Sequence, residues 1–466
     1  MQQHRSNIRQ AAKRQHGARK SYQHSTQQSG DRSRLRQSKS APSTICVVGL
    51  GYVGLPLALL LEARGNRVIG IDIDRRKVDA LHKHIAPYLS EDEQEQFRQS
   101  SMDIDVNPAR IREADVVIIC VPTPVGEDYQ PDLGPLQQAS MAVGTHLKRG
   151  ALVIVESTVN PGACEEHVLP ILVRHSGLVP EEEFYFAHCP ERINPGDPTW
   201  TVSTIPRVVG ANSPQSLARA KAVYESALDA DVYPMASIRE AEAVKMIENT
   251  FRDINIAFVN ELAMSFEKLG IDVVNVIRAA STKPFAFMPH FPGCGVGGHC
   301  IPVDPYYLME YAARHGFEHK LIRTAREINN DMPRYTVDLL EKELGNKGLR
   351  LFDSRIALLG LSYKANIPDT RESPALRIYD ELAERGALVQ AYDPYNNPDD
   401  IPAAGSLDEA LAGAHAIILA TGHDEFVALE PERMQEHGIN IIIDGRNCLQ
   451  KEAYLAAGLT YRGIGR

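Results

Sequence analysis

The sequence predicts an α/β fold with an N-terminal Rossmann domain over residues 43–236, a long central helical region over 237–330 and a second, Rossmann-like α/β domain over 331–466. Three observations support this prediction. A glycine-rich turn follows an apolar run of strand length, apolar patterns of strand and helix length alternate in both halves, and one long helical pattern separates the halves. At 466 residues the chain is too long for a single core, so several domains are expected.

Residues 1–42 differ in composition from the rest of the chain. They hold ten Lys or Arg residues and one acid, Asp31, for a charge of +9, so the net charge of −10 leaves −10 − 9 = −19 for the remainder. Few of them are apolar, so this head cannot bury enough surface to fold alone, and we expect a disordered basic tail. Two alternatives stay open: a contact with nucleic acid or an acidic surface, and an organellar transit peptide.

The rest of the chain has the composition of a globular protein. Apolar residues make up 43% of the sequence, and the seven cysteines form no CxxC pair and no zinc-finger spacing. This pattern favours a reducing compartment over a disulfide framework and gives no reason to expect a metal. No apolar run approaches the ~20 residues that cross a bilayer. We therefore expect a cytoplasmic protein with neither a membrane nor a nucleic acid as its partner.

The first predicted strand, from residue 44, ends in a GxGxxG turn over residues 49–54, and a helical pattern follows. In this arrangement the first glycine permits a tight turn, the second lets a pyrophosphate approach the backbone, and the third packs the helix against the strand. A second strand ends at Asp72, whose carboxylate would bind ribose hydroxyls and repel a 2′-phosphate, so we expect NAD rather than NADP. The residues expected to bind it are Gly49, Gly51, Tyr52, Val53, Gly54, Asp72 and Thr123.

More strands are expected along both halves of the chain. In the first half they lie at 115–121, 151–156 and 184–188, and the turns after the first two contain Thr123 and Thr158. Ligands of parallel sheets bind at such turns. The second half opens with a strand-to-helix unit at 355–364 and continues with strands at 388–392, 416–420 and 439–444. It lacks a GxGxxG, so it has another ligand or a purely architectural role.

A helical pattern covers residues 238–269. Apolar residues recur there at spacings of three and four, at Val244, Ile247, Phe251, Ile254, Phe258 and Leu262. Such a stripe predicts core packing or a dimer interface, and we expect a homodimer built on this helix. Lys245 and Asn249 are four residues apart, so they project from one face of the helix. An ordinary solvated pair would have the same spacing.

Residues 291–304 contain two cysteines, a histidine, an aspartate and four glycines. Glycines permit backbone conformations and close approaches that other residues do not. Cys300 follows His299 and precedes Asp304 by four residues. A thiol is a strong nucleophile when a neighbouring cation or base raises its thiolate fraction, so Cys300 is the candidate nucleophile and Cys294 is the competing thiol.

Seven motifs follow one another along the chain: Gly49-Leu-Gly-Tyr-Val-Gly-Leu-Pro56, Val121-Pro-Thr-Pro124, Glu156-Ser-Thr-Val-Asn-Pro-Gly162, Pro190-Glu-Arg-Ile-Asn-Pro-Gly196, Lys245-Met-Ile-Glu-Asn249, Gly297-Gly-His-Cys300 with Asp304, and Asp369-Thr-Arg-Glu-Ser373. With them the chain, from about residue 44 to near its C-terminus, resembles the nucleotide-sugar 6-dehydrogenases, the family of UDP-glucose and UDP-N-acetylhexosamine dehydrogenases. The resemblance implies a UDP-sugar substrate and a UDP-binding C-terminal domain.

The resemblance also implies a reaction. The family oxidises a sugar CH2OH to a carboxylate with two NAD, in two hydride transfers. Cys300 would form a thiohemiacetal, whose oxidation gives a thioester that water hydrolyses. Lys245 and Asn249 would stabilise the oxyanions formed on this path, because a cation and an amide donor favour developing negative charge.

Other positions follow from the same resemblance. Asp304 would orient or activate water, and Thr158 and Glu191 would hold water and take protons. UDP-glucose members carry a further glutamate where this chain has Pro195, so the division of base duty between Glu191 and Asp304 stays open. The residues implied to contact the substrate are Arg252, Gly293, Gly297, His299, Lys364 and Arg371.

The sugar is predicted from the same comparison. Arg252, three residues after Asn249, and the wording of the loop around Cys300 resemble the N-acetyl branch, and the Arg252 guanidinium could meet an acetamido carbonyl or a pyrophosphate. UDP-N-acetyl-D-mannosamine is the leading candidate, followed by UDP-N-acetyl-D-glucosamine and then UDP-glucose. More remote alternatives are a β-hydroxyacid dehydrogenase, which makes one hydride transfer and needs no thiol, and a non-catalytic nucleotide-sugar binder.

Overall fold

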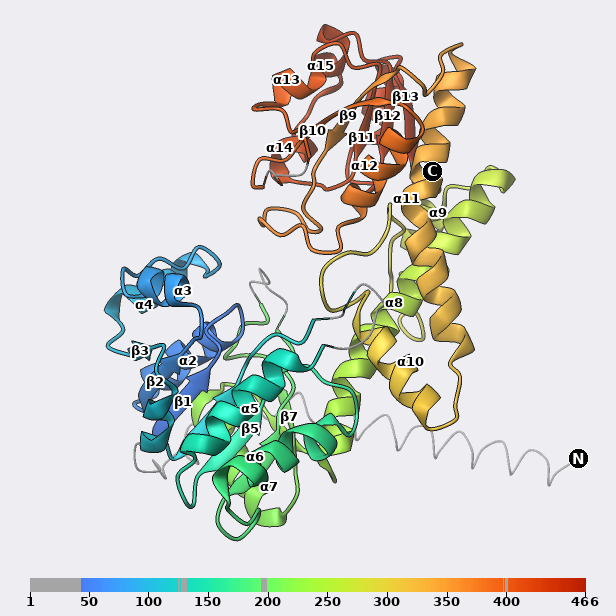
Figure 1. Ribbon diagram of the computed structural model, residues 1–466. Helices are drawn as coiled ribbons and strands as arrows, with labels where there is room; N and C mark the ends of the chain where they lie inside the picture. The colour runs from blue at the N-terminus through green and yellow to red at the C-terminus, as the bar shows by residue number, and fades with distance from the viewer. Residues whose placement is uncertain (1–42, 125, 127–131, 194–198, 397, 399–400) are drawn as a thin grey trace, which may run out of the picture.

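The computed structural model describes residues 43–124, 126, 132–193, 199–396, 398 and 401–466. The head expected to be a disordered tail, residues 1–42, lies outside the described residues, as does Pro195. Two α/β domains lie at opposite ends of the molecule, and long helices connect them (Figure 1). The α/β fold class is therefore confirmed. Within the described ranges, no helix is both long and apolar enough to cross a membrane.

The N-terminal domain contains an eight-stranded sheet of order β3-β2-β1-β4-β5-β6-β7-β8. All neighbouring strands pair in parallel except β6 and β7, which are antiparallel. The strands are β1 (Thr44–Val48), β2 (Arg67–Ile71), β3 (Asp103–Asp105), β4 (Val116–Ile119), β5 (Leu152–Val155), β6 (Tyr185–His188), β7 (Arg207–Ala211) and β8 (Val232–Pro234). The short edge strand β3 and the pair β7 and β8 were not expected from the sequence.

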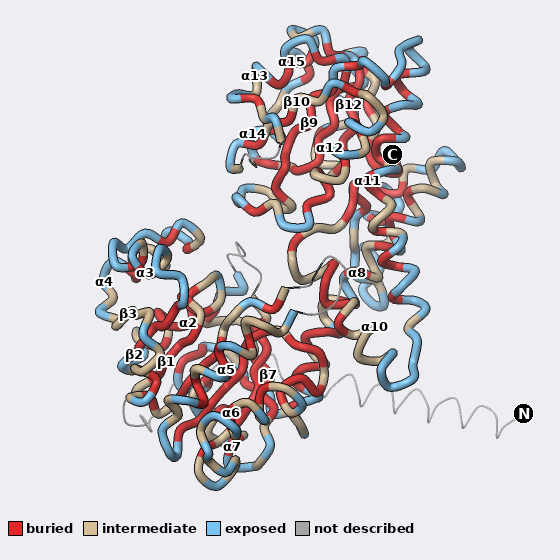
Figure 2. The backbone as a smooth tube through the Cα atoms, in the orientation of Figure 1, coloured by how far each residue is buried: buried red, intermediate tan, exposed pale blue. Residues whose placement is uncertain are grey.

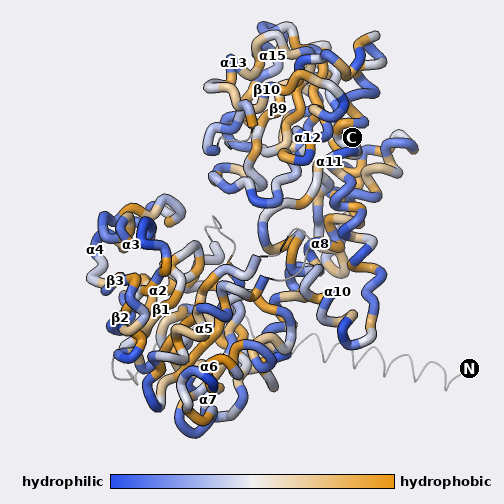
Figure 3. Tube along the Cα trace, in the orientation of Figure 1, coloured by the Kyte–Doolittle hydropathy of each residue, from blue (hydrophilic) through white to orange (hydrophobic). Residues whose placement is uncertain are grey.

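Helices cover this sheet. They are α2 (Gly54–Ala63), α3 (Arg75–Leu81), α4 (Glu91–Gln99), η2 (Pro108–Glu113), α5 (Gly134–His146), the π-helix η3 (Cys164–Val168), α6 (Leu169–Ser176) and α7 (Pro214–Ala227). Strands β4 and β5 are buried along their whole length, which explains why their sequences are unbroken apolar runs. The sheet therefore forms the buried, hydrophobic interior of the domain in Figures 2 and 3.

Helix α8 (Ile238–Leu269) has the extent that the sequence predicts and rises from the N-terminal domain toward the C-terminal one (Figure 1). The Ser237 hydroxyl caps its start by accepting the Glu240 N–H, and Gly270, with a φ of 68°, ends it in the left-handed conformation. The other central helices are α9 (Val273–Ala280), α10 (Asp304–Arg314) and α11 (Lys320–Asn346). The domain boundary expected at residue 330 lies inside α11.

Polar pairs join α8 to α11. Arg326 donates to Asp253 at 2.6 Å and Asn260 donates to Asn329 at 2.9 Å, all four residues being buried. Half of the apolar stripe of α8 is exposed and does not belong to this contact. Its members Ile247, Phe251 and Phe258 are 61%, 48% and 53% exposed.

The C-terminal domain contains a five-stranded, wholly parallel sheet of order β10-β9-β11-β12-β13. Its strands are β9 (Arg355–Leu359), β10 (Leu388–Tyr392), β11 (Ala416–Leu419), β12 (Ile441–Asp444) and β13 (Thr460–Gly463). Its helices are α12 (Pro374–Glu384), α13 (Leu407–Leu411), α14 (Asp424–Val427), α15 (Pro431–Glu436) and α16 (Lys451–Ala456). The three strands predicted between 388 and 444 are present, within two residues of their expected bounds.

Candidate active site between the two domains

The glycine turn after β1 has the geometry that its sequence predicts. Gly49 has a φ of 96°, and a Cβ there would lie 2.7 Å from the carbonyl oxygen of Cys120. A Cβ at Gly54 would lie 1.9 Å from the carbonyl oxygen of Gly49, so helix α2 could not begin so close to the strand with a larger residue. A Cβ at Gly51 would meet nothing within 4 Å. Gly51 therefore borders open space, and Val53 directly precedes α2.

Asp72 follows β2 and lies against this turn. Its Oδ2 accepts the N–H of Leu50 at 2.9 Å and the ammonium of Lys77 at 2.8 Å, and the residue is only 6% exposed. Tyr52 is 44% exposed, and its ring lies on that of Tyr88 with 4.9 Å between the centroids. The turn thus presents open backbone next to a fixed carboxylate, the combination that a dinucleotide requires.

The turns that follow β4 and β5 are tied to each other and to α10. The Thr123 hydroxyl donates to the carbonyl oxygen of Thr158 at 2.6 Å. The hydroxyl of Tyr307, in α10, donates to the carbonyl oxygens of Thr123 and Pro124 at 2.6 and 3.1 Å. The role of Tyr307 is not predictable from the sequence, because nothing in its spacing distinguishes it from other helical aromatic residues. It joins the turn expected to bind NAD to the helix that begins beside Cys300.

Lys245 and Glu191 face each other although they come from different parts of the chain. The Lys245 Nζ lies 3.5 Å from Oε2 of Glu191, and their side chains are 7% and 12% exposed. Burial disfavours the ammonium form of Lys245, but the negative charge of Glu191 and other neighbouring acidic groups outweighs burial, and the pKa of Lys245 is raised. Burial raises the pKa of Glu191, against the effect of Lys245. Lys245 is therefore a buried, protonated donor.

Asn249 meets Asp304, the first residue of α10. The side-chain amide of Asn249 donates to Oδ2 of Asp304 at 2.5 Å, and the backbone N–H of Asp304 donates to the carbonyl oxygen of Cys300 at 2.8 Å. Asp304 is 3% exposed. Burial raises its pKa to about 7, while Lys245 and Asn249 act in the opposite direction. This carboxyl group therefore gains and loses its proton near neutral pH.

Cys300 lies in the turn that precedes α10, with its Sγ 3.2 Å from Nδ1 of His299. Burial, followed by the charge of Asp304, raises the pKa of the Cys300 thiol to about 12, and Lys245 opposes this rise. Burial, followed by the charge of Arg371, lowers the pKa of His299 to about 4. The thiol is therefore protonated and the imidazole neutral at pH 7, so attack by sulfur requires a proton acceptor.

The competing thiol has different surroundings. Cys294 is fully buried, and its Sγ lies 3.5 Å from the carbonyl oxygen of Ala420, at the end of β11. Burial raises its pKa as well. Cys294 packs in the apolar core of the C-terminal domain near Arg446 and Asp444, whereas Cys300 lies near the catalytic candidates Lys245 and Asp304. Of the two thiols, Cys300 is the one that lies near the candidate catalytic residues.

The glycines of residues 291–300 are packed against protein. A Cβ at Gly297 would lie 2.7 Å from Cβ of Tyr363, and one at Gly298, where φ is 84°, would lie 2.7 Å from the Tyr363 ring. The N–H of Gly293 donates to the side chain of Asn260 at 3.0 Å. Close packing on the C-terminal domain explains why Gly297 and Gly298 carry no side chain, and the predicted contact of Gly293 and Gly297 with the sugar stays a prediction.

The basic residues expected at the substrate have different positions. Arg371 binds Asp369 through Nε at 3.0 Å and Nη2 at 2.6 Å, its side chain is 53% exposed, and its carbonyl oxygen accepts the N–H of Gly298 at 3.0 Å. Lys364 is half-buried in the turn after β9. Arg252 is exposed on α8, and within the described ranges it makes no hydrogen bond or ion pair with the residues around Cys300. The structure therefore joins Arg371 to the loop of the thiol, and the predicted contact of Arg252 with the substrate stays a prediction.

A buried ion pair supports the site from within the N-terminal domain. Arg207 lies 3.2 Å from Oε2 of Glu156, whose other oxygen accepts the Tyr224 hydroxyl at 2.5 Å, and the ion pair is completely buried. The carbonyl oxygen of Glu156 accepts the N–H of Glu191 at 3.4 Å. The sequence alone does not distinguish Arg207, because Arg67 and Arg355 also begin apolar strands and are exposed.

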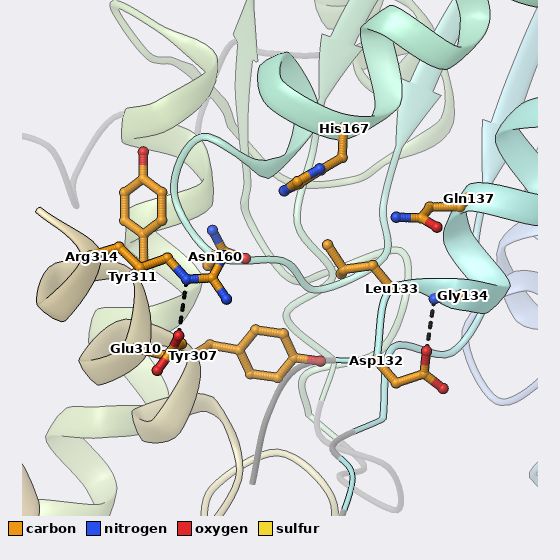
Figure 4. Close-up of a pocket in the computed structure, with 10 residues that line it drawn as sticks. All are labelled: Asp132, Leu133, Gly134, Gln137, Asn160, His167, Tyr307, Glu310, Tyr311 and Arg314. Atoms are coloured by element: carbon orange, nitrogen blue, oxygen red, sulfur yellow. Dashed lines mark hydrogen bonds and ion pairs between the residues drawn. The ribbon is translucent and has the colours of Figure 1, made fainter. Parts of the chain in front are cut away.

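A separate hollow of about 320 Å³ lies between α5, η3 and α10 (Figure 4). Figure 4 shows Tyr307 and Arg314 on one side of it and Asp132 on the other. Arg314 donates to Glu310 at 2.9 Å, so its charge is already paired. Cys300 does not line this hollow. Tyr307 is the residue that it shares with the candidate site.

Family models match three consecutive parts of the chain. They are the NAD-binding domain of the UDP-glucose/GDP-mannose dehydrogenase family at residues 43–228, its central domain at 239–331 and its UDP-binding domain at 357–451. The chain belongs to the UDP-glucose/GDP-mannose dehydrogenase family. The resemblance read from the motifs is therefore confirmed, as is NAD as the cofactor. Residues 43–228 are the NAD-binding domain, and the second sheet belongs to a UDP-binding domain.

Individual relatives agree with this assignment. A UDP-N-acetyl-D-glucosamine 6-dehydrogenase from Pseudomonas aeruginosa is 40% identical over 398 residues, which are 84% of this chain and 94% of that enzyme. A solved structure of a UDP-D-ManNAc dehydrogenase from Pyrococcus horikoshii is 36% identical, covers 91% of this chain and 99% of its own, and has a TM-score of 0.85. A UDP-glucose dehydrogenase from Pyrobaculum islandicum is 27% identical, covers 92% and 99%, and has a TM-score of 0.81. Enzymes named for different sugars thus share this fold.

Proposed function

We propose that this dehydrogenase oxidises C6 of a UDP-N-acetylhexosamine to the carboxylate, with UDP-N-acetyl-D-mannosamine as the leading substrate and UDP-N-acetyl-D-glucosamine as the alternative. One observation carries the proposal. Cys300 lies within reach of a buried cation, Lys245, and of a carboxyl group that titrates near neutrality, Asp304. A single alcohol oxidation needs no nucleophilic thiol, whereas oxidation to an acid through a covalent intermediate does.

The turn after β1 fits NAD. Gly51 offers open backbone where a pyrophosphate would lie, and Asp72 offers a carboxylate to the adenosine ribose. These residues would hold NAD, which would supply the acceptor for one hydride, and a second NAD in the same place would supply the acceptor for the other. Thr123 and Thr158, whose turns are joined by a hydrogen bond, would line the end of the cofactor that reacts.

Side chains of the protein would then accept the protons and stabilise the negative charges that form during the reaction. As the CH2OH group loses hydride, its hydroxyl proton must leave, and Glu191 and Asp304 are the carboxylates proposed to receive it. Lys245 remains protonated, so it would stabilise each oxyanion as a donor, and Asn249 would add an amide. Glu191, Lys245, Asn249 and Asp304 are thus proposed as the groups that surround C6.

Cys300 would carry the second half of the reaction. Its sulfur adds to the aldehyde carbon and its proton passes to a base, which gives a thiohemiacetal. Loss of the second hydride and of the hydroxyl proton gives a thioester. Water, oriented by Thr158 and Asp304, attacks the thioester carbon, and the C–S bond breaks to release the carboxylate and the thiol. One sugar and one water therefore consume two NAD.

The choice between the two N-acetyl sugars rests on relatives. Enzymes named for UDP-N-acetyl-D-mannosamine recur among those that match over about nine-tenths of this chain. One named for the glucosamine epimer has the higher identity of 40%. The test is to incubate the purified protein with NAD and each of UDP-N-acetyl-D-mannosamine, UDP-N-acetyl-D-glucosamine and UDP-glucose, and to measure NADH and uronate. Turnover of UDP-glucose alone, or one NADH per sugar, would overturn the proposal.

The protein is also proposed to be a homodimer through α8. Ile247, Phe251 and Phe258 are large, apolar and exposed, and their spacings of four and seven residues place them along one side of the helix. Light scattering coupled to gel filtration tests this, with Phe258→Asp as the variant expected to dissociate the dimer. A wild-type monomer at assay concentration would contradict it. A reducing compartment such as the cytoplasm is proposed because all seven cysteines are free; cell fractionation tests this location.

A further inference from the structure

Arg192 joins three parts of the molecule. Its Nε and Nη2 donate to the two carboxylate oxygens of Glu248, in α8, at 3.2 and 2.5 Å. Its Nη1 donates to the carbonyl oxygen of Pro206, directly before β7, at 2.9 Å. The two charged side chains are 24% and 34% exposed, so the pair is partly shielded from water. A bidentate pair of this kind fixes geometry as well as contributing energy.

The two partners are neighbours in sequence of the catalytic candidates. Arg192 directly follows Glu191, and Glu248 lies between Lys245 and Asn249, three residues after the first and one before the second. One partner therefore belongs to the segment that carries the carboxylate, and the other to the helix that carries the ammonium. Figure 1 shows that these elements belong to the N-terminal domain and to the helix that leaves it.

Glu191 itself is held by weak contacts. Its Oε2 lies 3.5 Å from the Lys245 nitrogen, and its N–H lies 3.4 Å from the carbonyl oxygen of Glu156. Both distances are at the long end of the hydrogen-bond range. Within the described residues, its Oε1 is buried and has no hydrogen-bond partner. The contacts of Glu191 alone thus do little to fix its carboxylate. The neighbouring residue Arg192 makes shorter hydrogen bonds, to Glu248 and Pro206.

We infer that the Arg192–Glu248 pair is a positioning clamp that sets the distance between the Glu191 carboxylate and the Lys245 ammonium. The inference rests on the proposed function, in which these two groups act on the same carbon. A misplacement of about 1 Å in such a pair can lower a rate about a hundred-fold. Arg192 and Glu248 are positioning residues, since neither is proposed to touch the sugar. The clamp contacts neither the turn after β1 nor the UDP-binding domain. Breaking it should therefore leave the affinities for NAD and for the UDP-sugar unchanged.

A second ion pair provides a matched control. Arg239, in the first turn of α8, donates to Glu165 of η3 at 2.5 Å, so it also joins α8 to the N-terminal domain. Arg239 lies six residues before Lys245, about 9 Å along the helix. Substituting Arg239 removes an arginine–glutamate contact across the same boundary without altering a neighbour of Glu191 or Asn249.

The kinetic test compares Arg192→Gln, Glu248→Gln and Arg239→Gln in the full-length protein. For the first two we expect kcat to fall about ten- to a hundred-fold, with the KM for the UDP-sugar and the Kd for NADH within about two-fold of wild type. Arg239→Gln should leave all three unchanged. The double variant Arg192→Gln/Glu248→Gln should be no slower than either single variant, and Arg192→Lys should recover part of the loss. Values of kcat within about two-fold of wild type for both single variants would overturn the inference.

A second measurement does not depend on turnover. Hydrogen–deuterium exchange of the protein without added ligands should show faster exchange in the peptide that contains residues 189–193 for Arg192→Gln and Glu248→Gln, but not for Arg239→Gln. Unchanged exchange in both would overturn the clamp. If the wild-type protein oxidised no UDP-sugar, the proposed function would fail, and exchange would still decide whether the pair holds the Glu191 segment. If Arg192→Gln does not fold, Glu248→Gln breaks the bidentate ion pair from the other side, because glutamine has no charge and only one acceptor oxygen.

Discussion

The side-chain amide of Asn249 donates to a carboxylate oxygen of Asp304 at 2.5 Å. Asn249 is therefore engaged by a member of its own site before any oxyanion forms. An oxyanion at C6 has to compete with Asp304 for this amide, and it competes best when Asp304 is protonated and accepts hydrogen bonds more weakly. The proton on Asp304 and the availability of the Asn249 donor are thus linked.

The pH dependence of the reaction should report Asp304. Because its pKa is about 7, the rate of uronate formation should rise between pH 6 and pH 8 as the carboxylate that activates water forms. Asp304→Asn should lower kcat about a hundred-fold or more and abolish this rise. Stopped-flow and steady-state rates across this pH range provide the measurement. Asp79→Asn, an exposed substitution, is the control, and an unchanged pH profile in Asp304→Asn would refute the assignment.

The same carboxyl group should affect stability in the opposite sense to most aspartates. Its folded pKa of about 7 exceeds the unfolded value of about 3.9, so its contribution to stability is complete below the unfolded value and is lost as the pH rises through 7. Asp304→Asn should therefore raise Tm relative to wild type, and the gain should be larger at pH 8 than at pH 5, where only part of the stability has been lost. Thermal melts at the two values check this. A larger gain at pH 5 than at pH 8 would contradict the raised pKa.

The role of the thiol is tested by Cys300→Ser. A serine hydroxyl at this position should stop the reaction after one oxidation or leave a trapped ester, so uronate formation should fall by at least about a thousand-fold. Mass spectrometry of the protein and NADH counted per sugar distinguish these two outcomes. Cys294→Ser should keep most of the activity, because Cys294 packs against the C-terminal domain. Wild-type uronate production by Cys300→Ser would exclude the covalent route.

Two alanine substitutions in one turn should have different effects. In Gly51→Ala the new Cβ meets open space, so the protein should fold normally and the KM for NAD should rise about ten-fold or more, because the methyl group occupies the approach of the pyrophosphate. In Gly54→Ala the Cβ meets the carbonyl oxygen of Gly49 at 1.9 Å, so Tm should fall. Calorimetry and NAD titrations measure both. A destabilised Gly51→Ala with normal KM would show that this backbone is not the cofactor surface.

Cofactor choice should depend on Asp72. Asp72→Asn keeps an oxygen for the Leu50 N–H but removes the charge that repels a 2′-phosphate and weakens the bond to a ribose hydroxyl. The KM for NAD should rise about ten-fold, and the ratio of kcat/KM for NADP to that for NAD should increase. Asp79→Asn is again the matched control. An unchanged ratio would mean that Lys77, not Asp72, governs the choice.

The sequence predicted the fold class, and motif order predicted residues that now lie together, including Lys245 and Cys300. Periodicity could not tell which face of α8 meets the rest of the molecule, because a stripe identifies residues that share a face and not what lies opposite them. Phe251 therefore proved exposed, while the face toward α11 holds the buried pair of Asn260 and Asn329. The role of Tyr307 could not be predicted because its hydroxyl donates to a backbone carbonyl oxygen, and the spacing of side chains in the sequence does not reveal such a contact.

The packing of Gly297 and Gly298 on Tyr363 has a consequence for protein engineering. Libraries that randomise the loop next to the nucleophile are a usual route to new substrate preference. Here most variants at these two positions would misfold before their selectivity could be measured. Loss of activity on substitution in this loop would therefore not show that the loop contacts the sugar. Selections for an altered preference between the two N-acetyl epimers should instead leave residues 291–300 fixed and diversify the surfaces on either side of them.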